Sequence, residues 1–266
     1  MPTLRINGTE LFYEEHGTGQ QTVFLAHGLV LSGRMYHHQV MALRHRFRCI
    51  TMDFRGQGRS AVADVGYDMN TLARDVAMLL RRLDAAPSHY VGLSMGGFVG
   101  MRLALREPDL LRSLTLINTG ADADSISDRF RSVLMSTMVR LFGLRSVAGR
   151  AMRLLFGRDF NRNPDRAEER RIWHRELLAN NRTGIVRAAT GVRRRERFLD
   201  EIEQIELPTL IIAGEDDRAL PPVHSQRMHE RIAGSQLITL PGVGHNCCLE
   251  APQLVNEQLA KFFDSV

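Results

Sequence analysis

The strongest constraint on the fold is the pentapeptide Gly92-x-Ser94-x-Gly96, which joins an apolar run to a segment of helical character. The apolar run ends at Leu93 and residues 98–105 have helical character, so Ser94 falls on a strand-to-helix turn. In a turn this tight the serine holds an unfavourable backbone conformation, and the flanking glycines let neighbouring chain approach. The motif also fits a glycine-rich turn with a solvated serine, but the strand and helix context favours a nucleophile.

Length and composition predict one large α/β domain with an insertion. The chain has 266 residues, of which 44% are hydrophobic, so a single domain can bury a substantial core. No apolar run approaches the roughly 18 to 20 residues that a membrane-spanning helix needs, and residues 1–8 lack the apolar centre of a signal peptide. We therefore expect a soluble, cytoplasmic protein with no membrane partner.

Strand and helix patterns alternate along most of the chain. Asn7-Gly8 is a strong signal for a hairpin between two short strands. The alternation of strand and helix patterns along the rest of the chain predicts a mostly parallel sheet with helices on both faces. The expected strands are 4–6, 11–15, 22–26, 47–52, 90–93, 113–118, 208–214 and 236–240, and the expected helices outside the elbow are 36–45, 70–83, 223–232 and 252–263.

Between about residues 121 and 206 the sequence has helical patterns only. We expect these helices at 128–142, 147–156, 167–180 and 184–198, and we predict a helical cap over 121–206. Residues 1–120 and 207–266 then form the core domain. The cap holds 18 arginines against 13 acidic residues, an excess that equals the net charge of +5 of the whole chain. No nucleic-acid-binding signature accompanies this excess, so we expect no nucleic-acid partner.

Two strand ends carry the groups that would activate a serine. A serine hydroxyl needs a base within hydrogen-bond reach and an acid that orients the base. Glu215, Asp216 and Asp217 follow one expected strand, and His245 follows the next in the pattern Gly-x-Gly-His. Because ligand chemistry in such sheets gathers beyond the carboxyl ends of the strands, these side chains are expected near Ser94.

The sequence resembles the α/β-hydrolase superfamily along essentially its whole length, and within it the capped esterases, enol-lactonases and cofactor-free haloperoxidases. The resemblance implies an eight-stranded, mostly parallel sheet flanked by helices, with the cap inserted. Five motifs carry it, in chain order: His27-Gly28, Asp53-x-Arg55-Gly56-x-Gly58-x-Ser60, Gly92-x-Ser94-x-Gly96-Gly97, Gly214-x-x-Asp217-x-x-x-Pro221 and Gly244-His245.

The resemblance implies a catalytic triad of Ser94, Asp217 and His245. The family's Gly-x-x-Asp spacing selects Asp217, and Asp216 remains the alternative if the loop register differs. The implied oxyanion hole consists of the backbone amides of Leu29 and Met95. No set of His, Asp and Glu has metal-ligand spacing and no phosphate-binding or dinucleotide motif is present, so we predict no metal and no cofactor.

The implied activity is hydrolysis of carboxylic esters or lactones with small to medium acyl chains through an acyl-enzyme. A serine at position 94, in place of an aspartate, argues against haloalkane dehalogenase and epoxide hydrolase activity. The alternatives are hydrolysis of a carbon–carbon bond, as in meta-cleavage products, and a perhydrolase or haloperoxidase side activity. A non-enzymatic ligand receptor is disfavoured by the complete triad. The expected partner is a small molecule, and the sequence is compatible with a homodimer.

The cap is expected to form a lid over Ser94 with an apolar underside. Trp173, Met138 and Phe142 are the candidate substrate contacts, although their helical spacing is equally what packing requires. One of the cap arginines is a candidate clamp for a substrate carboxylate, as in an enol-lactone or the half-ester of a dicarboxylic acid. Solvated helix faces account for most of these arginines.

Overall fold

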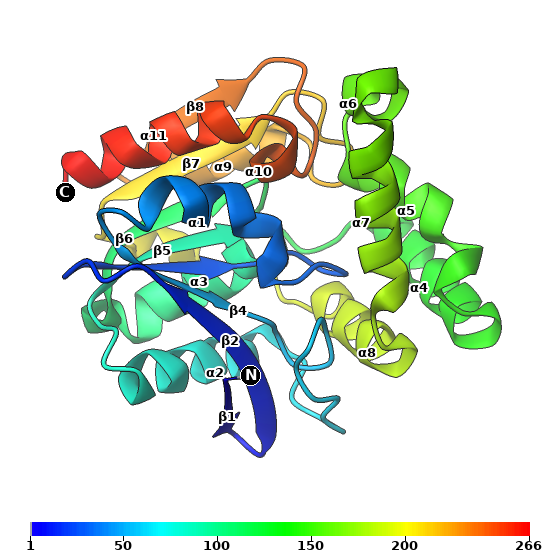
Figure 1. Ribbon diagram of the computed structural model, residues 1–266, viewed down its shortest axis with the longest axis horizontal. Coiled ribbons are helices and arrows are strands. Elements are labelled where there is room, and N and C mark those ends of the chain that lie inside the picture. Colours follow the sequence, from blue (N-terminus) through cyan, green and yellow to red (C-terminus); the bar gives the residue numbers. More distant parts are fainter. Residues whose placement is uncertain (1) are drawn as a thin grey trace.

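The computed structural model describes residues 2–266, which form one eight-stranded sheet flanked by helices (Figure 1). The strand order is β1-β2-β4-β3-β5-β6-β7-β8, as predicted for a mostly parallel sheet. Only the β1–β2 and β2–β4 pairs are antiparallel. The strands are β1 Thr3–Ile6, β2 Thr9–His16, β3 Thr22–Ala26, β4 Arg48–Met52, β5 Ser88–Leu93, β6 Leu111–Ile117, β7 Thr209–Gly214 and β8 Gln236–Leu240.

The sequence explains both kinds of strand. Strands β3, β5 and β7 are buried along their whole length, which matches their continuous apolar character in a sheet covered on both faces. Asn7 and Gly8 have φ values of 45° and 76°, the left-handed conformations that a two-residue hairpin turn requires between β1 and β2. The predicted hairpin is therefore confirmed.

Helices cover the two faces of the sheet in separate groups. Helices α2 and α3 pack on one face, and α1 and α11 pack on the other (Figure 1). The carboxylate of Asp68 accepts a hydrogen bond from the Thr71 amide, which caps α2. The helices outside the insertion are α1 His37–Leu43, α2 Met69–Arg82, α3 Met95–Arg106, α9 Val223–Arg231, α10 Cys247–Glu250 and α11 Pro252–Asp264.

All of the regular secondary structure between β6 and β7 is helical. These helices lie together at one end of the sheet (Figure 1) and bury an apolar cluster of their own around Val139, Leu144 and Leu177. They are α4 Ile126–Phe142, α5 Ala148–Leu155, α6 Arg158–Arg162, α7 Ala167–Ala179 and α8 Arg182–Arg193. Short 3-10 helices occupy Gly33–Tyr36, Pro108–Leu110, Leu144–Ser146, Pro164–Arg166 and Glu201–Gln204.

The main departure from the expected elements is the end of α8. The helix was expected to reach Phe198, but it ends at Arg193. Beyond it the Phe198 amide donates to the carbonyl of Ala121 at 2.7 Å, so the chain turns back to the start of the insertion. A contact across the whole insertion therefore overrides the local helical pattern. Within residues 2–266, no helix is both long enough and apolar enough to cross a membrane.

Candidate active site

Ser94 lies between the end of β5 and the start of α3 in a strained conformation, with φ 54° and ψ −113°. A Cβ atom on Gly92 would come within 2.5 Å of the Gly96 backbone, and one on Gly96 would come within 2.1 Å of the Ala26 carbonyl oxygen. Only glycine therefore fits on either side of the serine. The Ser94 amide donates to the Ile117 carbonyl at 2.9 Å, which connects the turn to β6.

Asp217 and His245 form a buried hydrogen-bonded pair beyond the ends of β7 and β8. His245 Nδ1 lies 2.7 Å from Asp217 Oδ2, and the two residues are 3% and 4% exposed. The other carboxylate oxygen accepts the amides of Ala219 and Leu220 at 2.8 and 2.9 Å. An ionised carboxylate only accepts hydrogen bonds, so Nδ1 carries the proton and Nε2 is left as the basic nitrogen.

Asp216, the alternative acid, points to a different partner. Its carboxylate accepts hydrogen bonds from the Arg158 amide at 2.6 Å and from Arg158 Nε at 2.9 Å. Successive side chains on extended chain point in opposite directions. The structure therefore pairs Asp217 with His245 and Asp216 with the helical insertion.

Asn118 connects three strand ends around the pair, a role that the sequence analysis missed. Its Nδ2 donates to the carbonyls of Gly244 and His245 at 3.0 and 2.8 Å, and its Oδ1 accepts the Gly214 amide at 2.6 Å. The signal available in the sequence was that Asn118 is a polar residue at the carboxyl end of β6, next to the strand that leads to Ser94. These bonds fix the backbone of His245 relative to β6 and β7.

The amides expected to form the oxyanion hole are free of protein partners. Among the hydrogen bonds of residues 2–266, neither the Leu29 nor the Met95 amide serves as a donor. His27 supports the loop before Leu29, because its Nε2 accepts the Phe54 amide at 2.9 Å and its Nδ1 donates to the Gly28 carbonyl at 2.7 Å. Burial lowers the pKa of His27, which favours the neutral ring.

Gln57 connects the two sides of this candidate oxyanion hole. Its Oε1 accepts the amide of Val30 at 2.8 Å, and its Nε2 donates to the thioether sulfur of Met95 at 3.7 Å. Val30 has φ 63°, an unfavourable value for a β-branched residue. The buried Gln57 amide therefore holds a strained turn directly after Leu29.

Glu250 connects the His245 loop to the helical insertion. Its Oε2 accepts the amides of Gly157 and Gly244 at 3.0 and 3.1 Å. Burial raises the pKa of this carboxyl to about 7, although the accepted hydrogen bonds act in the opposite direction. Gly244 directly precedes His245, so the ionisation of Glu250 bears on the loop that carries the candidate base.

A cavity of about 620 Å³ lies between the core and the insertion. On the core side its wall contains Leu29 and Val30, together with Ala219 and Leu220, whose amides hold Asp217. The insertion supplies most of the apolar wall: Met135, Val139, Leu144, Val147, Ala151, Leu154, Leu177, Ile185, Val186, Ala189 and Val192.

The three cap residues named as candidate substrate contacts do not line this cavity. Phe142 is 66% exposed at the end of α4, and Met138 packs on the apolar cluster of the insertion. Phe142 lies on the same helical face as Met135, seven residues away, but Val139 is the last residue of α4 in the cavity wall, so Phe142 lies beyond the cavity at the exposed end of the helix. Trp173 is buried in the core cluster that also contains Phe156 and Phe160.

Comparisons with known proteins agree with this architecture. The family model described as alpha/beta hydrolase fold matches residues 21–252. A Mycobacterium tuberculosis relative, provisionally named a non-heme bromoperoxidase, is 31% identical over 96% of this chain and 98% of its own. A thermophilic esterase from Thermogutta terrifontis has a TM-score of 0.92 and 29% identity, with 100% of this chain and 99% of that chain covered. The enol-lactonase from Burkholderia xenovorans has a TM-score of 0.91 and 26% identity, with 99% and 100% covered. The chain belongs to the alpha/beta hydrolase family.

Proposed function

We propose that the protein is a serine hydrolase that cleaves carboxylic esters or lactones through an acyl-enzyme. The observation that carries this proposal is the buried Asp217–His245 pair, held at the same sheet edge as the strained Ser94. The register supports the placement, since β5 pairs with β6, β6 with β7 and β7 with β8, all in parallel. Nucleophile, acid and base then follow the chain order of the family.

In the proposed reaction, the Ser94 hydroxyl oxygen attacks the substrate carbonyl while Nε2 of His245 takes its proton. The amides of Leu29 and Met95 donate hydrogen bonds to the oxyanion, and each such bond contributes about 3 to 4 kcal/mol to transition-state stabilisation. His245 returns the proton to the departing alcohol, which leaves an acyl ester on Ser94. Water deprotonated by His245 then releases the acid and restores the serine.

We infer the substrate class from the large cavity, whose wall contains Leu29 of the proposed oxyanion hole but not Ser94 or His245. Its apolar wall from α4, α5, α7 and α8 suits an acyl chain of small to medium length, and the insertion acts as a lid. The esterase and the enol-lactonase among the structural relatives bear names of the same reaction class. An ester or a lactone of this size is therefore the proposed substrate.

Arg150 is the proposed carboxylate clamp of the cavity. Five arginines contribute to the cavity wall, and four of them lie within ion-pair distance of a carboxylate. Those pairs are Arg131 with Asp128, Arg195 with Asp124, Arg227 with Asp122 and, at 3.8 Å, Arg218 with Asp216. Among the residues that the structure describes, Arg150 has no such partner, so its guanidinium is available to a substrate carboxylate.

A peracid-forming side reaction is a second candidate, because the Mycobacterium tuberculosis relative and a structure from Bacillus anthracis are named for bromoperoxidase activity. Hydrogen peroxide would replace water as the nucleophile that cleaves the acyl-enzyme, and a peracid would leave in place of the acid. Bromination of a dye in a mixture of bromide, acetate and hydrogen peroxide, where the peracid oxidises bromide to hypobromous acid, tests this route, and it should depend on Ser94.

The proposed function is tested with p-nitrophenyl esters from acetate to decanoate, on the wild type and Ser94→Ala. We expect turnover of the short and medium esters that is lost in the variant while its circular dichroism and melting temperature match the wild type. Turnover retained by Ser94→Ala would contradict the nucleophile. A folded wild type inactive on every ester and lactone would overturn the proposed substrate class.

A further inference from the structure

A stripe of exposed apolar side chains runs along α4, which lies at the outer edge of the insertion (Figure 1). We call it the α4 stripe; it consists of Ile126, Phe130, Val133, Leu134 and Leu141. Their spacings of three, four and seven residues place them on one face of the helix. Their exposure ranges from 46% for Val133 to 90% for Ile126. Single exposed apolar residues are ordinary, but a contiguous set is typical of an interaction surface.

The opposite face of α4 is the one that holds the helix in place. Met135 and Val139 on that face line the large cavity, and both also belong to or pack on the apolar cluster of the insertion. The α4 stripe therefore contributes little to packing within residues 2–266.

The charged side chains along the edge of the α4 stripe are arginines. Arg129 and Arg140 lie four residues before and seven residues after Val133, and both are exposed. Among residues 2–266 neither forms an ion pair, whereas Arg131 pairs with Asp128 on the cavity side of the helix.

The surrounding chain is basic as well. Between residues 126 and 158 Asp128 is the only acidic residue, against seven arginines. These are Arg129, Arg131, Arg140, Arg145, Arg150, Arg153 and Arg158. The positive charge of this side of the insertion is therefore not balanced within its own segment.

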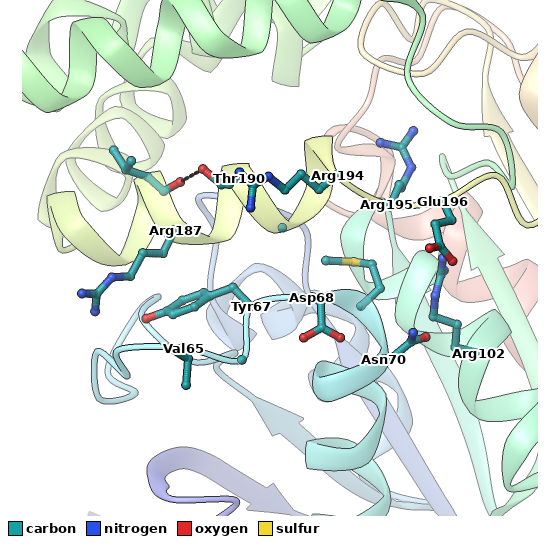
Figure 2. Close-up of a pocket in the computed structure, with 14 residues that line it drawn as sticks. Val65, Tyr67, Asp68, Asn70, Arg102, Arg187, Thr190, Arg194, Arg195 and Glu196 are labelled. Carbon is teal, nitrogen blue, oxygen red and sulfur yellow. Dashed lines mark hydrogen bonds between the residues drawn. The ribbon is translucent and has the colours of Figure 1, made fainter.

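The helix that packs on α4 adds no negative charge either. Helix α8 has no acidic residue between its first and last residues. Its Arg187 lines a separate cavity of about 430 Å³, on the face of α8 turned away from α4 (Figure 2). Asp68 and Glu196 contribute acidic groups to the wall of that cavity. Charges of both signs therefore meet there, whereas the α4 stripe is bordered by cations.

A second copy of the chain fits the α4 stripe poorly. In a symmetric dimer the same patch of each subunit meets itself, so the arginines beside the two stripes would face one another without acidic partners. An anionic lipid surface offers what the stripe lacks, because its acyl region accepts apolar side chains and its headgroups attract arginines.

We propose that α4 docks on an anionic lipid surface, with the α4 stripe at the boundary between headgroups and acyl chains and with Arg129 and Arg140 among the headgroups. Such a peripheral contact needs no membrane-spanning helix. The proposal replaces the expectation of no membrane partner, which rested on the lack of a long apolar run. It concerns the outside of the insertion and does not depend on the proposed hydrolase reaction at Ser94.

Flotation of the full chain with lipid vesicles tests the proposal. The vesicles contain either phosphatidylglycerol mixed with phosphatidylcholine or phosphatidylcholine alone. We expect the wild type to bind the anionic vesicles, to bind the neutral ones much more weakly, and to leave the anionic ones as salt is raised.

Variants locate the contact. Phe130→Ser combined with Leu134→Ser should lower the partition coefficient about 10- to 100-fold, because two apolar side chains no longer enter the lipid. Leu254→Ser is the matched control, since it changes an exposed leucine on α11, and it should leave binding unchanged. Arg140→Gln should lower binding about fivefold, and Arg112→Gln, at the exposed start of β6, should not.

Three outcomes would overturn the docking surface. The first is a wild type that does not bind anionic vesicles. The second is binding reduced equally by the stripe variants and by their matched controls, which would reflect only the net charge of the chain. The third is a dimer in sedimentation velocity that the Phe130 and Leu134 substitutions abolish while vesicle binding is unaffected, which would make the stripe an interface between copies. If the double variant fails to fold, Ile126→Ser takes its place, because that side chain is the most exposed of the stripe.

Discussion

Replacing Asp217 with Asn changes only one atom but reverses one hydrogen bond. The Asn carbonyl oxygen can still accept the amides of Ala219 and Leu220, so the loop keeps its two anchoring bonds. The new NH₂ group then occupies the place of the Oδ2 atom that lies 2.7 Å from His245 Nδ1. A donor at that position forces Nδ1 to accept, which moves the ring proton to Nε2 and removes the base that Ser94 needs.

The expected loss in kcat/KM for Asp217→Asn is about 10⁴-fold, or about 5.5 kcal/mol of transition-state stabilisation. Asp216→Asn is the matched control, since it changes the neighbouring carboxylate, whose main partner Arg158 has a side chain that is 63% exposed. The Arg158 end of this ion pair is exposed although Asp216 is 11% exposed, so the pair contributes about 1 kcal/mol to stability. We expect activity within about threefold of the wild type.

Both variants are assayed as kcat/KM on p-nitrophenyl butyrate between pH 6 and 9, after thermal melts confirm the fold. Near-normal activity in Asp217→Asn with a large loss in Asp216→Asn would refute the assignment of the acid. Comparable large losses in both would mean that loop geometry, and not the His245 tautomer, limits the reaction.

Three further predictions concern Glu250, Gln57 and Arg150. Because the pKa of Glu250 is raised from 4.5 to about 7, the folded protein keeps a proton that the unfolded chain releases in that window, and wild-type stability falls as pH rises through it, by up to about 3 kcal/mol. The Gln of Glu250→Gln does not titrate. In urea unfolding, the free energy of unfolding of this variant relative to wild type should therefore increase from pH 5 to pH 8 by about that amount. A difference that is the same at both pH values would contradict the raised pKa of Glu250. Gln57→Leu should lower kcat about 10- to 100-fold with little change in KM, since the Val30 turn loosens and misplaces the Leu29 amide; a pure KM effect argues against this role. Arg150→Met should lower kcat/KM about tenfold or more for half-esters of dicarboxylic acids and leave neutral esters of equal size unchanged; equal losses on both classes exclude the clamp.

The sequence was sufficient for the sheet because its strands carry local signals. Continuous apolar runs such as Thr22–Ala26 predict buried parallel strands, and Asn7-Gly8 predicts the antiparallel hairpin at the edge. The order of Ser94, Asp217 and His245 along the chain likewise made a triad the expectation before any geometry was known. The structure pairs Asp217 with His245, and the catalytic roles of the three residues stay a prediction.

The parts that escaped prediction depend on contacts between distant segments. Apolar spacing on α4 does not tell how far along the helix a cavity extends, and so Met138 and Phe142 were chosen although Met135 and Val139 lie in the wall. The three hydrogen bonds of Asn118 join backbone groups about a hundred residues away, which no local pattern records. The early end of α8 depends on a bond to Ala121 in the same way.

The most direct test of Ser94 as the nucleophile is covalent labelling with a fluorophosphonate followed by intact-mass and peptide mass spectrometry. We predict a single phosphonyl adduct on the peptide that contains Ser94, formed in the wild type, absent from Ser94→Ala and greatly slowed in Asp217→Asn. A protein that turns over esters while it remains unlabelled, or that carries the adduct on another residue, would contradict the proposed mechanism.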